Sequence, residues 1–212
     1  MTRYFVNETE IPSPPPGISS LDEVLKHVEK TYLHPGSAIR QVLVDGRLVL
    51  PDALEAVPCG FLNGFGEREK VEITTGSLLG IARDSVTEAV SYLGRIESAI
   101  PSLAAGFQAY PGPEAFENLK EFYTGFYWLN LLLERLKTNF AAAYPETTPQ
   151  GVPLREHQEG FISILKQLVD AQERGDFVLI ADLLEYEILP VIPVWKEFFE
   201  GIARNLGAAS ET

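Results

Sequence analysis

The sequence predicts an α+β protein in which a small N-terminal α/β sheet domain precedes an antiparallel four-helix bundle. Apolar residues mostly alternate through the first part of the chain, whereas from Ser77 onward they recur every three or four residues. Turn-forming residues are dense in the first part, and proline-rich breaks separate long apolar seams in the second. We therefore expect an α/β domain over residues 1–76, a helical bundle over 77–206 and a flexible tail over 207–212.

The N-terminal domain is expected to contain short strands around one helix. Ser20-Leu21-Asp22-Glu23 has the form of a capping box, which starts a helix that ends at His34-Pro35-Gly36. Asp45-Gly46 lies between two β-branched runs and suits a two-residue hairpin turn. Strands are predicted at Arg3–Val6, Thr9–Ile11, Ile39–Val44, Arg47–Leu50 and Lys70–Thr75, with a long loop over 51–67. A β-grasp arrangement is a candidate for this sheet, although the strand order stays open.

Four apolar seams predict the helices of the bundle. They run from Ala82 to Leu103, from Leu119 to Phe140, from His157 to Ala171 and from Phe177 to Ile202. Arg174-Gly175-Asp176 combines a helix-ending glycine with an N-cap aspartate, so the last two helices should be antiparallel neighbours. Pro190 and Pro193 interrupt the fourth seam, and we expect a kink or break near Leu189.

Composition and charge restrict the environment and the partners. The single cysteine, Cys59, fits a reducing compartment, and the sequence shows neither a secretion signal nor a long apolar span, so we expect a cytoplasmic protein. The net charge of -13 opposes binding to nucleic acid or to an anionic membrane. A protein partner or a second copy of the chain remains the expected binding partner.

Recognisable catalytic and metal-binding patterns are missing from the sequence. No histidine follows a glutamate by three residues, and His27, His34 and His157 fall in separate segments. There is no nucleophile elbow, and the glycine-rich stretch Gly60–Gly66 is not followed by the lysine of a phosphate-binding loop. We therefore expect no catalytic residue, no metal site and no cofactor.

The second predicted helix carries more aromatic surface than one buried face requires. Tyr123, Tyr127 and Trp128 lie beside its apolar seam. Either the N-terminal domain covers these rings or they meet a partner, and both alternatives stay open. These three residues are the candidate partner-binding site.

A second candidate is the acidic cluster around Tyr186. Asp182, Glu185 and Glu187 accompany this tyrosine in the fourth predicted helix. A solvated helix face is the ordinary explanation, and a pocket between the bundle and the N-terminal domain is the functional one.

Two stretches together resemble an uncharacterised bacterial family of similar length. They are Ser20–Leu25, with the later Pro35-Gly36 and Val44-Asp45-Gly46, and the segment Gly175–Glu187. The resemblance covers most of the chain but implies no activity, cofactor or binding residue.

These observations favour a non-enzymatic cytoplasmic interaction or adaptor protein. Its aromatic bundle surface would bind a protein partner or a second copy, and a chaperone-like holder of an apolar segment is one version. The alternative is a small-molecule-binding protein or an unrecognised enzyme with its pocket between the two domains.

Overall fold

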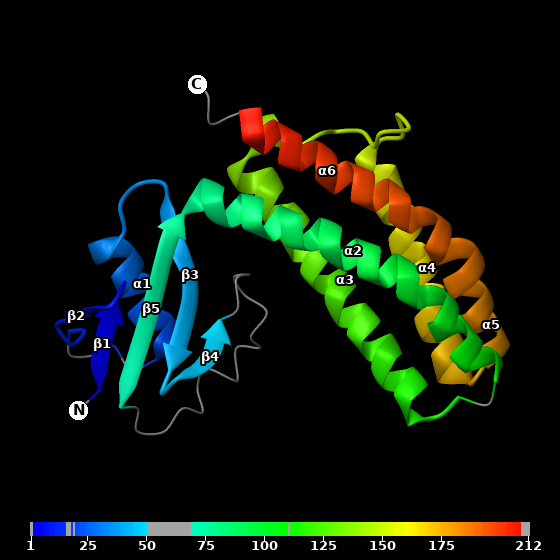
Figure 1. The fold of residues 1–212 in the computed structure, drawn as a ribbon, viewed down its shortest axis with the longest axis horizontal. Helices are drawn as coiled ribbons and strands as arrows, with labels where there is room; N and C mark the ends of the chain where they lie inside the picture. Colours follow the sequence, from blue (N-terminus) through cyan, green and yellow to red (C-terminus); the bar gives the residue numbers. More distant parts are fainter. Residues whose placement is uncertain (1, 16–17, 19, 51–68, 110, 209–212) are drawn as a thin grey trace. The chain divides into compact units, whose positions relative to one another are not determined.

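A computed structural model describes residues 2–15, 18, 20–50, 69–109 and 111–208, and it has an α+β fold (Figure 1). The chain divides into two compact units, Met1–Ser85 and Val86–Thr212. The helix α2 (Leu78–Gln108) spans this division. The predicted domain limits at residues 76 and 206 stay predictions. The predicted loop over 51–67, with Cys59 and the glycine-rich stretch, lies outside the described residues, as do residues 209–212 of the predicted tail.

The first unit contains a five-stranded sheet with the order β2-β1-β5-β3-β4. Its strands are β1 (Arg3–Val6), β2 (Thr9–Ile11), β3 (Ser37–Val44), β4 (Arg47–Leu50) and β5 (Lys70–Ser77). The pair β1 and β5 is parallel, and the other three pairs are antiparallel. The strand order, which the sequence left open, therefore brings the first and last strands together at the centre of the sheet.

Both hairpins turn through two residues with positive φ. Asn7 and Glu8 have φ of 47° and 67°, and Asp45 and Gly46 have φ of 50° and 75°. These values suit the right-handed twist of the flanking strands, and the predicted turn at Asp45-Gly46 is confirmed. The Asn7 side chain also accepts a hydrogen bond from the Thr75 amide at 2.9 Å and donates one to Thr75 Oγ1 at 2.7 Å. Asn7 therefore connects the first hairpin to β5.

The helix α1 (Leu21–Tyr32) completes the core of the first unit. The predicted capping box is confirmed, because Ser20 Oγ accepts from the Glu23 amide at 3.2 Å and the Glu23 carboxylate accepts from the Ser20 amide at 3.1 Å. The helix and the sheet share one apolar cluster of buried residues: Leu21, Val24, Val28, Ile39, Val42, Val44, Val49, Val71 and Ile73. Burial of this cluster supplies the main driving force for the unit.

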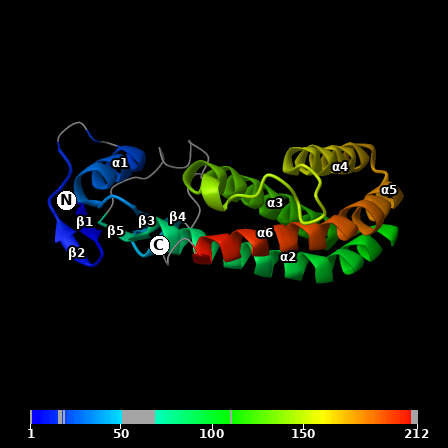
Figure 2. The same cartoon turned by 90° about the horizontal axis from the view of Figure 1, so that it is seen from above.

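The second unit is helical, and its helices run lengthwise past one another (Figure 2). Besides α2 it contains α3 (Pro113–Asn139), α4 (Leu154–Arg174), α5 (Phe177–Asp182) and α6 (Ile192–Ala208), with the short 3₁₀ helix η2 (Ala141–Ala143) after α3. Aromatic contacts join neighbouring helices. Phe126 of α3 lies 4.7 Å from Phe161 of α4 between ring centroids, and Phe161 lies 6.1 Å from Trp195 of α6. These contacts place the second, third and fourth apolar seams around a common aromatic core.

The fourth predicted helix is divided by irregular turns. A π-helix, η3 (Leu183–Ile188), and a 3₁₀ turn, η4 (Leu189–Val191), separate α5 from α6. Pro190 and Pro193 have no amide hydrogen, so the regular hydrogen-bond ladder cannot continue through them. The irregularity falls where the sequence predicted a break. The turn before α5 also agrees with the prediction, because Gly175 has φ 67° and Asp176 caps the next helix through the Leu179 amide at 3.1 Å.

Candidate functional site: an aromatic groove in the helical unit

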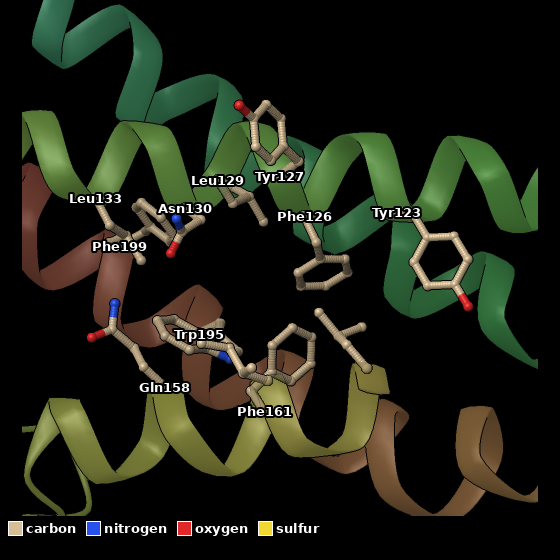
Figure 3. Close-up of a pocket in the computed structure, with 12 residues that line it drawn as sticks. Tyr123, Phe126, Tyr127, Leu129, Asn130, Leu133, Gln158, Phe161, Trp195 and Phe199 are labelled. Carbon is tan, nitrogen blue, oxygen red and sulfur yellow. The ribbon is translucent and has the colours of Figure 1, made fainter. Parts of the chain in front are cut away.

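An apolar groove of about 270 Å³ lies between α3, α4 and α6 (Figure 3). We call it the α3–α4 groove, because these two helices form its walls while α6 lies behind them. Its lining residues are Tyr123, Phe126, Tyr127, Leu129, Asn130, Leu133, Gln158, Phe161, Ile162, Leu165, Trp195 and Phe199. Apart from two amides and two tyrosine hydroxyls, the side chains of this lining are almost entirely apolar.

Helical spacing places these residues on the groove. On α3, Phe126, Leu129 and Leu133 follow one another at intervals of three and four residues, and all three are buried. On α4, Phe161 and Leu165 repeat the interval of four. Residues at this spacing share one face of a helix, so each wall presents a continuous apolar stripe.

The floor of the groove is a network of packed rings. Trp195 and Phe199 come from α6, one helical turn apart, and both are buried. The ring of Phe126 lies 4.7 Å from those of Phe122 and Phe161. Such contacts hold the rings in defined positions, so the groove exists before any ligand arrives.

The two rims contain apolar side chains that reach solvent. Tyr127 of α3 is 57% exposed and Ile162 of α4 is 46% exposed. Figure 3 shows the Tyr127 ring on the side of α3 that faces away from α4. Large exposed apolar residues next to an apolar groove are typical of binding surfaces.

Buried polar atoms near the groove have no hydrogen-bond partner among the described residues. They include Tyr123 Oη, Trp195 Nε1 and His157 Nε2. Burial raises the pKa of the Tyr123 phenol to about 12. Burial lowers the pKa of His157 below its ordinary value of 6.5, and this imidazole contacts the tilted ring of Trp195 with 4.8 Å between ring centroids. The Tyr123 phenol and the His157 imidazole are therefore both held in their neutral forms at pH 7.

The structure separates the three aromatic residues predicted as a partner site. Tyr123 and Tyr127 line the groove, whereas Trp128 is not part of its lining. The Trp128 ring instead contacts Tyr92 of α2, at 6.0 Å between ring centroids. Phe161 and Trp195 belong to predicted core seams, and nothing in the sequence placed them in a groove. Only their convergence in space distinguishes a groove floor from an ordinary core.

The acidic candidate residues lie elsewhere in the helical unit. Asp182 ends α5, and Glu185, Tyr186 and Glu187 belong to the π-helix. Tyr186 is 65% exposed, and the Glu185 carboxylate accepts a hydrogen bond from the Gln108 amide at 3.4 Å. None of the four lines the α3–α4 groove. The pocket between domains that they would line stays a prediction.

Within the described residues, no group of three or more His, Cys, Asp or Glu side chains could hold a metal ion. In the same part of the chain, no helix has the length and apolar character needed to cross a membrane.

Comparison with known proteins identifies the family. Residues 84–198, more than half of the chain, match the family described as "Domain of unknown function (DUF8042)", and the chain belongs to this family. The matched region contains every lining residue of the groove except Phe199. An uncharacterized protein of Treponema pallidum (strain Nichols) is 22% identical over 188 residues, which cover 86% of this chain and 87% of that protein. No solved structure matches the chain. The resemblance to an uncharacterised family without an assigned activity is thus confirmed.

Proposed function

We propose that this chain is a non-enzymatic cytoplasmic interaction protein whose α3–α4 groove binds a helical segment of a protein partner. The observation that carries the proposal is the groove itself, with a preformed aromatic floor and the half-exposed Ile162 on the α4 rim. A chaperone-like protein that covers an aggregation-prone segment is one version. A second copy of the chain could supply the segment in place of another protein.

The dimensions of the groove support a helix as the occupant. Tyr123 and Leu133 are ten residues apart on α3, which corresponds to about 15 Å along the helix axis. An amphipathic helix places anchoring side chains at positions i, i+3 or i+4, and i+7, over roughly 10 Å. The α4 wall runs from Gln158 to Leu165, about 10 Å along its axis. The groove therefore accommodates two or three anchoring side chains of one segment.

The chemistry of the lining supports binding over catalysis. The described lining residues provide aromatic and aliphatic side chains, the amides of Asn130 and Gln158, and two tyrosine hydroxyls. None of them is a carboxylate, imidazole, thiol or amine that would exchange protons near neutral pH. Such a lining binds apolar groups and selects among them by shape.

We propose two finer assignments of the fold as well. The strand order β2-β1-β5-β3-β4, with its parallel central pair and the helix α1 after the first hairpin, supports the β-grasp type for the first unit. The aromatic contacts among α2, α3, α4 and α6 support an antiparallel four-helix bundle for the second, with α5 and α6 together as the fourth helix.

The docking proposal is tested with tryptophan fluorescence and a defined peptide. Trp128 and Trp195 are the two tryptophans of the chain, so the variant Trp128→Phe leaves Trp195 in the groove floor as the single indole reporter. An uncharged amphipathic peptide of leucine and glutamine should change the Trp195 emission in a saturable manner. Binding of indole without binding of the peptide would make the groove a small-molecule site and contradict the proposal.

A matched pair of surface substitutions tests whether the peptide occupies the groove. Ile162→Gln should weaken binding roughly five-fold, because about 1 kcal/mol of apolar burial is lost at a side chain that is already half buried. Val178→Gln on α5, where the side chain is 66% exposed, should leave binding unchanged. Equal effects of the two substitutions would contradict docking in the groove. Light scattering on the same variants shows whether a second copy of the chain supplies the segment.

A further inference from the structure

We propose that the occupant of the α3–α4 groove is a basic amphipathic helix, with lysine or arginine residues flanking its apolar stripe. This inference rests on the proposed function and adds the charge and the register of the partner segment. It follows from the charge of the chain, from the distribution of charge beside the groove and from the position of two side-chain amides.

The charge of the chain favours a cationic partner. The net charge of the chain is -13, and residues 86–208, which contain the groove, carry 17 Asp and Glu residues against 9 Lys and Arg residues. The described lining of the groove itself contains no charged residue. A segment that approaches the groove therefore experiences the field of excess carboxylates on the surrounding surface. At low ionic strength this field extends over roughly 30 Å, and it raises the association rate of cationic partners.

Two basic residues close to the groove are paired with neighbouring carboxylates. Lys120 lies one helical turn before Tyr123, and its Nζ is 3.4 Å from a Glu117 carboxylate oxygen. Arg155 precedes Gln158 by three residues, and its Nε is 2.8 Å from a Glu159 carboxylate oxygen. These pairs limit the repulsion that Lys120 and Arg155 would otherwise exert on a basic segment.

Two side-chain amides lie toward one end of the groove, where the apolar residues Leu133 and Phe199 also line it. Asn130 of α3 and Gln158 of α4 lie on opposite walls toward the same end, and Tyr123 lies at the other end (Figure 3). A side-chain amide both donates and accepts hydrogen bonds, so a polar group of the segment can pair there. Asn130 is exposed and Gln158 is half-buried, so an apolar anchor here would displace water from the amides without replacing its hydrogen bonds. The apolar stripe should therefore extend toward Tyr123, with a polar residue opposite Asn130 and Gln158.

The test uses three peptides of about 16 residues with the Trp128→Phe protein. The first carries leucine at i, i+3, i+4 and i+7 with lysine on the outer face, and the second replaces every lysine with glutamate. The third has the composition of the first but distributes its leucines around the helix. We expect the lysine peptide to bind at least ten-fold more tightly than the other two at low salt. This advantage over the glutamate peptide should shrink as the salt concentration rises toward about 1 M.

The outcomes separate the inference from the proposed function. Equal binding of the lysine and glutamate peptides would overturn the basic partner while leaving the groove as a docking site. Equal binding of the lysine peptide and its redistributed control, with no effect of Ile162→Gln, would show surface electrostatics alone and would also overturn the inference. Failure of all three peptides and of the uncharged peptide to bind would remove the proposed function itself.

The register of the segment has its own test. Asn130→Leu should improve binding of a peptide that carries leucine opposite Asn130 and Gln158, and an unchanged affinity for this peptide would refute the predicted register.

Discussion

Gly125 of α3 packs directly against the side chain of Tyr92 on α2, and this contact predicts the effect of a substitution on stability. A Cβ atom built on Gly125 would overlap the phenol of Tyr92, and it would lie 2.8 Å from Tyr92 Cε1. The close approach is possible only because glycine has no side chain. Gly125→Ala must therefore displace Tyr92, whose ring contacts Phe126 at 6.5 Å and Trp128 at 6.0 Å between centroids.

The expected change in the free energy of unfolding is the sum of two opposing contributions. Displacement of the Tyr92 ring weakens two aromatic pairs and strains the packing around them, which costs about 3 kcal/mol. Replacement of glycine by alanine in a helix returns about 1 kcal/mol. Gly125→Ala should therefore lower the free energy of unfolding by about 2 kcal/mol. For a chain of this length the thermal midpoint should fall by roughly 4–8 °C.

Urea denaturation followed by circular dichroism measures this change, and Gly160 provides the matched control. Gly160 lies within α4, and nothing lies within 4 Å of a Cβ built on it. Gly160→Ala should consequently stabilise the protein by up to about 1 kcal/mol. The double variant Tyr92→Leu with Gly125→Ala should cost less than the sum of its single changes, because leucine leaves room for the new methyl group. Equal stabilisation by Gly125→Ala and Gly160→Ala would refute the close approach of Tyr92.

Two further predictions concern the first hairpin and the imidazole beside the groove. Asn7→Ala should lower the free energy of unfolding by about 1–2 kcal/mol, because it removes both hydrogen bonds to Thr75 and places alanine at φ 47°. Asn7→Gly should lower the free energy of unfolding by less than Asn7→Ala, because glycine adopts positive φ without strain. An equal loss for the two variants would show that the positive φ contributes nothing to the effect. For His157 the folded-state pKa lies below the unfolded value of 6.5, so the unfolded state binds more protons as the pH falls through this range. The free energy of unfolding should therefore fall as the pH drops below about 6.5, and His157→Phe should remove that part of the slope in urea titrations. Parallel pH profiles for the two proteins would contradict burial of a neutral imidazole.

Part of the candidate site could be predicted from the sequence. The excess of aromatic rings on α3 drew attention to Tyr123 and Tyr127, and both line the groove. Trp128 was assigned to the same surface but contacts Tyr92. Adjacent helical residues point about 100° apart, so the rotation of α3 against its neighbours decides which ring reaches the groove. A seam of apolar residues does not specify that rotation.

The sequence by itself determined the local features of this protein. The capping box at Ser20, the turn at Asp45-Gly46 and the helix end at Gly175 each depend on interactions within a few residues. The change of apolar period likewise separated the sheet from the helices. These features were predictable because steric and hydrogen-bonding preferences of short segments decide them.

The tertiary structure alone decided the order of the strands and the existence of the groove. The parallel pairing of β1 with β5 joins segments about 67 residues apart in sequence, and no local preference encodes such a pairing. Phe126, Phe161 and Trp195 come from three different helices, and each by itself has the pattern of a core residue. Whether apolar faces close completely or leave a groove depends on how whole helices pack, because the same hydrophobic pattern satisfies both arrangements.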